Sequence, residues 1–158
     1  MANEKIYRPG AIGAILDEYE RALGDLKKLV ASLSEDDFTR IVDNKTTDPD
    51  CKSVQTIVRH VINSGFGYPN YIRAFFGEEI NKPEIGVLTK DVSLRMLHEM
   101  FAYNVATFSH RYSMTEAEAE AVKFKTRWGP EHSLESIMEH AIVHVLRHRR
   151  QIERLLSL

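Results

Sequence analysis

Apolar residues recur every three or four positions along most of this chain, which is the spacing of amphipathic helices. The first such segment covers residues 9–33, and Pro9 is tolerated in the first turn of a helix. Ser34 and Asp37 then have the spacing of a capping box, which predicts a short helical turn. Residues 39–52 are polar and contain Asp48-Pro49-Asp50, so we expect a loop there.

Three further periodic segments follow. The second helix is expected to begin at Ser53, a favourable N-cap residue, and to continue to residue 76 with a kink near Pro69. The third covers residues 91–111 and the fourth residues 133–156. The inward face of the third is expected to carry Leu94, Leu97, Phe101, Val105 and Phe108. Residues 77–90 form a connection, and the mostly polar residues 113–130 contain a second capping pattern at Thr115. No alternating pattern of useful length predicts a strand.

Four amphipathic segments of roughly 20 residues predict an all-α protein, a four-helix bundle with a short extra helical turn or two in the connections. The length of 158 residues is that of a single domain, which we expect to cover residues 1–158. Functional sites in such bundles are built from side chains on facing helices.

Composition narrows the class of protein. The formal net charge of −2 does not favour nucleic-acid binding, and no apolar run is long enough to cross a membrane. Cys51 is the single cysteine, so no intramolecular disulfide can form, which fits a reducing compartment. Residues 1–5 lack the apolar core of a secretion signal. We therefore expect a cytoplasmic protein.

Histidines carry the candidate chemistry. His140, His144 and His148 are spaced four residues apart in the fourth segment, so successive rings lie above one another on the helix. On a helical wheel His148 falls within the apolar arc and His144 at its edge, whereas His140 falls among charged residues. Two buried imidazoles need partners for their ring nitrogens, and a metal ion would bind both.

His60 is the best candidate for a third ligand from another helix. It lies in the middle of the second segment, and the nearby Asn63 and Ser64 would leave room for a pocket that they line. Three imidazoles from two helices would form an open site for a divalent transition metal: zinc or nickel first, with iron, manganese or copper as alternatives. A plainer interpretation is a solvated basic face on the last helix, with His60 as an ordinary core residue.

The last helix resembles a known family signature. The run His140-x3-His144-x3-His148-Arg149-Arg150-Gln151-Ile152 is similar to the His-x3-His-x3-His-Arg-Gly-Gln-Ile signature of the DinB/YfiT-like superfamily. The histidine of the second helix and Trp128-Gly129 before the last helix follow the same order. The resemblance implies a four-helix bundle with its metal triad at His60, His144 and His148. Arg150 replaces the usual glycine and could narrow the pocket.

The family includes thiol-dependent transferases and isomerases, and metal-dependent hydrolysis is often assumed for it. The first hypothesis is therefore a metal-dependent hydrolase or thiol S-transferase that acts on a small molecule, with a low-molecular-weight thiol as a possible cosubstrate. Arg147, Arg149 and Arg150 could then form a basic pocket rim. The alternatives are a non-catalytic metal-binding protein and a helical interaction module. The sequence assigns no catalytic residue.

Several other features lead to lesser expectations. Bundles of this kind often pair through helix faces, which makes a homodimer possible. Trp128 is expected to plug the end of the bundle, and His98, His110 and His132 are expected at the surface because they lack ligand spacing.

Overall fold

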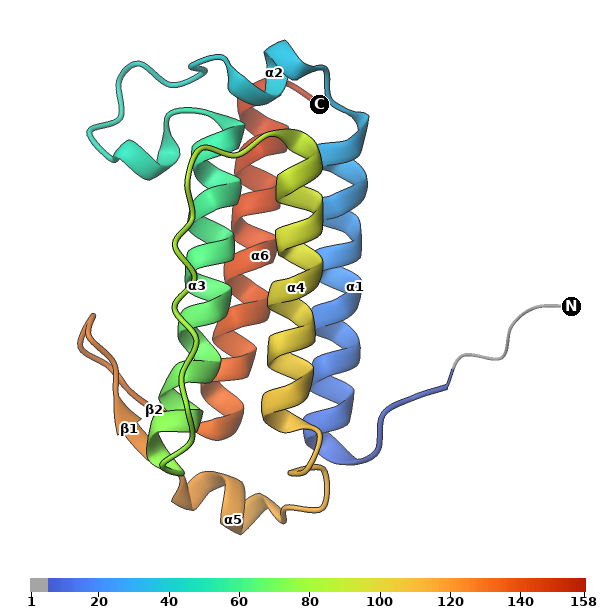
Figure 1. Ribbon diagram of the computed structural model, residues 1–158, viewed down its shortest axis with the longest axis vertical. Helices are drawn as coiled ribbons and strands as arrows, with labels where there is room; N and C mark the ends of the chain where they lie inside the picture. Colours follow the sequence, from blue (N-terminus) through green and yellow to red (C-terminus); the bar gives the residue numbers. More distant parts are fainter. Residues whose placement is uncertain (1–5) are drawn as a thin grey trace, which may run out of the picture.

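Four long helices form the protein, as the apolar periodicity predicted (Figure 1). The computed structural model describes residues 6–158; residues 1–5, on which the prediction of no secretion signal partly rests, lie outside that range. The long helices are α1 (Gly10–Ser32), α3 (Val54–Phe75), α4 (Lys90–Phe108) and α6 (Leu134–Leu156). The predicted fold class, an all-α four-helix bundle, is confirmed.

The helices α1 and α6 run in one direction and α3 and α4 run in the other (Figure 1). Because α3 and α4 are parallel, the connection between them returns along the whole length of the bundle. Each of α1 and α3 packs against both α4 and α6. The histidines of the second and fourth predicted segments therefore lie on neighbouring antiparallel helices, α3 and α6.

Short elements occupy the connections. They are α2 (Glu35–Thr39), the 3-10 helix η1 (Pro49–Cys51) and α5 (Glu116–Ala121). Ser34, Ser53 and Thr115 each accept a hydrogen bond from a backbone N–H of the following turn, so the three predicted N-caps are confirmed. The η1 turn lies within the predicted loop, where Asp48 caps it.

A small β-hairpin was not predicted. Strands β1 (Lys123–Lys125) and β2 (Glu131–Ser133) pair antiparallel just before α6. The turn between them is closed by Thr126, whose N–H and hydroxyl both donate to the carbonyl of Pro130. Gly129 in this turn has a φ of 116°, which favours glycine. Strands of three residues are too short to produce a recognisable alternation.

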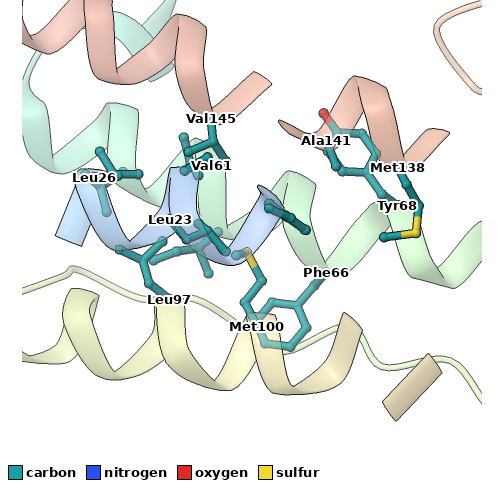
Figure 2. Close-up of a cluster of buried hydrophobic side chains, with 14 of the residues drawn as sticks. Leu23, Leu26, Val61, Phe66, Tyr68, Leu97, Met100, Met138, Ala141 and Val145 are labelled. Carbon is teal, nitrogen blue, oxygen red and sulfur yellow. The ribbon is translucent and has the colours of Figure 1, made fainter. Parts of the chain in front are cut away.

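The core is a single cluster in which all four long helices take part. Figure 2 shows Leu23 of α1, Val61 of α3, Leu97 of α4 and Val145 of α6 among its members. All four are buried. Removing this apolar surface from water is the main stabilising contribution, and it fixes the spacing of α3 and α6.

Helix α3 continues without a break past Pro69. Proline lacks the N–H that would bond the carbonyl of Gly65, four residues earlier. The buried side chain of Asn104 on α4 supplies the missing donor, with Nδ2 3.0 Å from the Gly65 oxygen. A Cβ on Gly65 would lie only 1.9 Å from Sδ of Met100, so glycine permits the close approach of α3 and α4.

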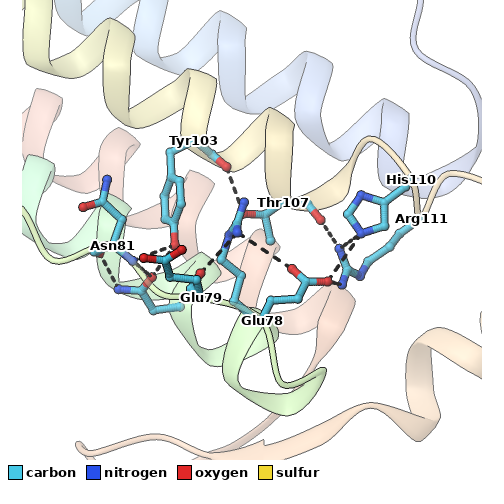
Figure 3. Close-up of polar contacts among 9 residues, drawn as sticks. Glu78, Glu79, Asn81, Tyr103, Thr107, His110 and Arg111 are labelled. Atoms are coloured by element: carbon cyan, nitrogen blue, oxygen red, sulfur yellow. Dashed lines mark hydrogen bonds and ion pairs between the residues drawn. The ribbon is translucent and has the colours of Figure 1, made fainter.

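Polar contacts attach the start of the α3–α4 connection to the bundle (Figure 3). The backbone N–H of Asn81 donates to Oδ1 of Asn70 and to the hydroxyl of Tyr103. Three residues earlier in the chain, Glu78 pairs with the buried Arg111. These contacts hold residues 78–81 against the C-terminal halves of α3 and α4.

No helix within residues 6–158 combines the length and apolar character that a membrane span requires.

Candidate metal centre

Three imidazole rings converge between α3 and α6. The Nε2 atom of His144 lies 3.0 Å from Nε2 of His60 and 3.2 Å from Nε2 of His148. The three ligand atoms all lie within 4.8 Å of one another. His144 and His148 are one helical turn apart on α6, which directs both rings to the same side, and His60 faces them from α3. The structure thus brings together the three histidines named from the sequence.

Hydrogen bonds orient two of these rings from behind. Nδ1 of His60 lies 3.2 Å from Oδ2 of Asp50, and Nδ1 of His148 lies 2.8 Å from Oε1 of Gln151. Both partners are acceptors, so each Nδ1 carries the hydrogen and each Nε2 presents its lone pair to the centre. Such outer contacts are typical of metal-binding histidines.

Cys51 adds a further contact behind His148, through Gln151. The side chain of Gln151 is hydrogen-bonded to the thiol of Cys51, which identifies its amide nitrogen as the donor toward sulfur and its oxygen as the acceptor from His148. Cys51 in turn lies 3.5 Å from a carboxylate oxygen of Asp48. The η1 turn therefore supports the centre twice, through Asp50 and through Cys51.

Burial keeps the α6 histidines neutral. Removal from water, with smaller contributions from neighbouring His148 and His60, lowers the pKa of His144 to about 3. Burial also lowers the pKa of His148. His144 and His148 are each 8% exposed, whereas His60 is half-buried. Neutral imidazole is the form that binds metal.

The three Nε2 atoms are better suited to bind a metal ion than to hydrogen-bond to one another. If His60 and His148 carry their hydrogens on Nδ1, only the Nε2 of His144 can donate within the centre, and it has one hydrogen at most. At least one nitrogen lone pair then faces another nitrogen at close to hydrogen-bond distance without a proton between them. A divalent transition metal would accept all three lone pairs.

A cavity of about 410 Å³ opens beside His60 and His144. Asn63 and Ser64, the two residues expected to line a pocket, lie in its wall. The wall also contains the aromatic rings of Tyr68, Tyr71 and Trp128, and the hydroxyl of Tyr68 is hydrogen-bonded to Ser64. Burial raises the pKa of Tyr68 to about 12, so it remains a protonated donor at neutral pH.

The remaining histidines separate into two groups. His140 lines the cavity and stacks on Trp128, with ring centroids 5.5 Å apart. Trp128 is 47% exposed and forms part of the cavity wall, so the prediction that it plugs the bundle end is wrong. His132 is half-buried, contacts the Trp128 ring and bonds Ser136, contrary to the surface position expected for it.

His98 and His110 are exposed, as predicted. The expected basic rim is present only in part, because the positive charge of Arg147 acts on Tyr68, His140 and His144 of the cavity. Arg149 pairs with Asp25 of α1, and neither it nor the exposed Arg147 and Arg150 belongs to the cavity lining. Arg150 therefore does not narrow this pocket. The arginine that does line it is Arg127, in the turn of the hairpin.

Sequence reasoning missed Asp50, Gln151, Tyr68 and Arg127 among the contributors to the site. Gln151 had a detectable signal, because it lies one helical turn after His148 and belongs to the run that resembles the family signature. Tyr68 is eight residues after His60, about two turns along the same helix. Asp50 and Arg127 lie in connections, and only the folding of those connections brings Asp50 to the centre and Arg127 to the cavity beside it.

A four-helix bundle with three histidines converging between two of its helices defines the class of this protein. The model of the DinB superfamily matches residues 18–152, so the chain belongs to that superfamily. The fold is similar to the crystal structure of a conserved protein from Enterococcus faecalis, with 13% sequence identity and a TM-score of 0.58. The likeness covers 94% of this chain and 96% of that one. No protein with a curated description matches the chain.

Proposed function

We propose that this protein binds one divalent transition metal ion through His60, His144 and His148 and uses it as an enzyme acting on a small molecule. The observation that carries the proposal is the convergence of three Nε2 atoms within 4.8 Å, two of them oriented by hydrogen bonds at Nδ1. Zinc and nickel suit three neutral imidazoles best, and iron and manganese are the next candidates.

Three protein ligands and an adjacent cavity favour catalysis over a purely structural site, because structural metal sites usually have four protein ligands. A bound divalent ion would act as a Lewis acid, which lowers the pKa of a coordinated water or thiol and polarises a carbonyl group. Both hydrolysis and transfer of a low-molecular-weight thiol use this chemistry.

The cavity residues have distinct abilities. Tyr68 remains protonated and can donate a hydrogen bond to an oxygen of the substrate. Burial keeps the pKa of His140 below the ordinary histidine value, so its neutral ring can accept a proton from a substrate. Asn63 and Ser64 offer further polar contacts beside His60.

The first test is the metal content of the protein purified without a histidine tag. Elemental mass spectrometry should find about one transition metal ion per chain, and the ion should be lost in His60→Ala and in His148→Ala. His98→Ala, which changes an exposed histidine on α4, is the matched control and should retain the metal. Circular dichroism would verify that each variant is folded.

Metal-free protein that also fails to take up added zinc, nickel, iron or manganese would contradict the proposal and leave a helical interaction module. With a metal bound, hydrolase substrates and thiol-transfer pairs can be screened with that ion. Turnover that disappears in His148→Ala would establish the enzyme, and its absence in both screens would favour a non-catalytic metal-binding protein.

A further inference from the structure

A second cavity of about 310 Å³ adjoins the first along α3. The two share Gly67, Tyr71 and Arg127 in their linings, so they lie end to end beside the same face of the helix. The first cavity begins at His60 and His144, and the second ends near Ile80 and Lys82. We call the combined space the α3 groove.

Aromatic rings form the middle of the α3 groove. Trp128 meets Tyr68 and Tyr71 edge to face, with centroids 6.0 and 5.9 Å apart. Tyr71 stacks on Phe124 of β1 at 5.4 Å with an interplanar angle of 7°. The hairpin therefore fixes the aromatic surface, which suits a flat or apolar section of a ligand.

The charged lining of the α3 groove is entirely basic. Arg127 lines both cavities and Lys82 lines the second, and no Asp or Glu of residues 6–158 lines either one. Within residues 6–158, the guanidinium of Arg127 forms no ion pair with an acidic side chain. An unpaired arginine beside a cavity is a ready partner for a carboxylate, which it can bind through two hydrogen bonds.

The fold holds the backbone at Arg127 and next to Lys82. The N–H of Arg127 donates to the hydroxyl of Tyr71, 3.1 Å away, which attaches the hairpin turn to α3. Lys82 follows Asn81, which Asn70 and Tyr103 hold in place (Figure 3). At the other end, three neutral imidazoles would not cancel the charge of a divalent ion. Positive charge is thus expected at the metal end and at Arg127.

We propose that the α3 groove binds a small organic acid. The metal-binding group of this acid lies at the metal held by His60, His144 and His148. The flat or apolar middle of the acid lies against Tyr68, Tyr71 and Trp128. Arg127 binds the carboxylate of the acid. This inference rests on the proposed metal site and adds the class of substrate to it.

The test uses the metal-loaded protein and hydroxamic acids, which bind transition metals directly. Benzohydroxamic acid is compared with a series that carries a para carboxylate, attached directly or through a short methylene arm. At low ionic strength, at least one carboxylate probe should bind about five-fold more tightly than benzohydroxamic acid in isothermal titration calorimetry. Added salt should reduce this advantage.

Arg127→Gln should abolish the advantage of the carboxylate while leaving the affinity for benzohydroxamic acid unchanged. Arg154→Gln removes the same charge from an exposed site at the end of α6 and should keep the advantage. Arg127→Lys should restore part of it, because lysine retains the charge but not the paired hydrogen bonds.

Equal binding of all probes to the wild-type protein, or an advantage that survives in Arg127→Gln, would overturn the inference while leaving the metal site intact. A protein that binds no metal in the elemental measurement would overturn both the metal site and this inference. The two failures are therefore distinguishable.

Discussion

Single contacts at the imidazole nitrogens determine how well the centre is prepared for a metal. Asp50 orients His60, and without it the ring could rotate or carry its hydrogen on Nε2. We expect Asp50→Ala to weaken metal binding by about ten-fold. Competition with a chromophoric chelator would measure this affinity. Asp36→Ala, which removes an exposed carboxylate on α2, should bind like wild type; equal affinity of the two variants would contradict the role of Asp50.

The lowered pKa of His144 predicts how the metal-free protein responds to acid. An unfolded histidine takes up a proton near pH 6.5, whereas the folded protein holds His144 neutral down to a pKa of about 3. Below about pH 6.5 the unfolded state therefore binds more protons than the folded state, and stability falls as the pH falls. Urea unfolding of the chelator-treated protein should show this loss between neutral and mildly acidic pH.

His144→Gln should lessen the dependence of stability on pH, because it removes the group whose pKa differs most between the two states. His98→Gln changes an exposed histidine and should leave the dependence as it is in wild type. A wild-type slope in His144→Gln would mean that other groups cause the acid sensitivity.

Among the helix contacts, the close packing of α3 against α4 depends on Gly65, which has no side chain. Gly65→Ala would force Met100 to move inside a filled core, and we expect a loss of about 1–3 kcal/mol in the free energy of unfolding. Gly24→Ala on α1, where a Cβ meets nothing within 4 Å, should instead stabilise by about 0.5–1 kcal/mol. Chemical unfolding would measure both. Combining Gly65→Ala with Met100→Ala should cost less than the sum of the two.

Asn104 compensates for a proline in the neighbouring helix. Asn104→Ala should destabilise the protein by about 1–3 kcal/mol, because it leaves the Gly65 carbonyl without its donor. Pro69→Ala restores a backbone N–H that can bond the same carbonyl, so the cost of Asn104→Ala should be smaller in that background. A double-mutant cycle measured by urea unfolding tests this; strict additivity would contradict the compensation.

The helix boundaries were largely readable from the sequence, but the face that α4 buries was readable only in part. We expected Leu94, Leu97, Phe101, Val105 and Phe108 to point inward. Leu97 and Phe108 are buried, and Leu94 and Phe101 are partly buried and pack against the core, so the expectation fails only for Val105. The buried positions also include Ser93, Asn104 and Thr107, which the expectation did not contain. Hydroxyl and amide groups that bond nearby carbonyls can be buried at low cost, and apolar periodicity alone cannot detect this.

For the molecule as a whole, a bound metal would link α3, α6 and the η1 turn. Because the unfolded chain lacks a preformed site, binding should stabilise the folded state by about 2.7 kcal/mol when free metal is one hundred times its dissociation constant. Thermal unfolding with and without chelator measures the change. The stabilisation should vanish in His148→Ala and persist in His98→Ala; an equal shift in both would mean that the metal binds elsewhere.

That two copies of this chain form a homodimer stays a prediction.

The sequence by itself determined the helical class, the three N-caps and the family, because helical periodicity, capping and a short signature are local patterns. It also assigned His144 and His148 to one helical face. The tertiary structure decided what surrounds the histidines. Asp50 and Arg127 reach the site from opposite ends of the bundle through connections without periodicity, so only the folded arrangement of α3, α6 and the hairpin brings them there.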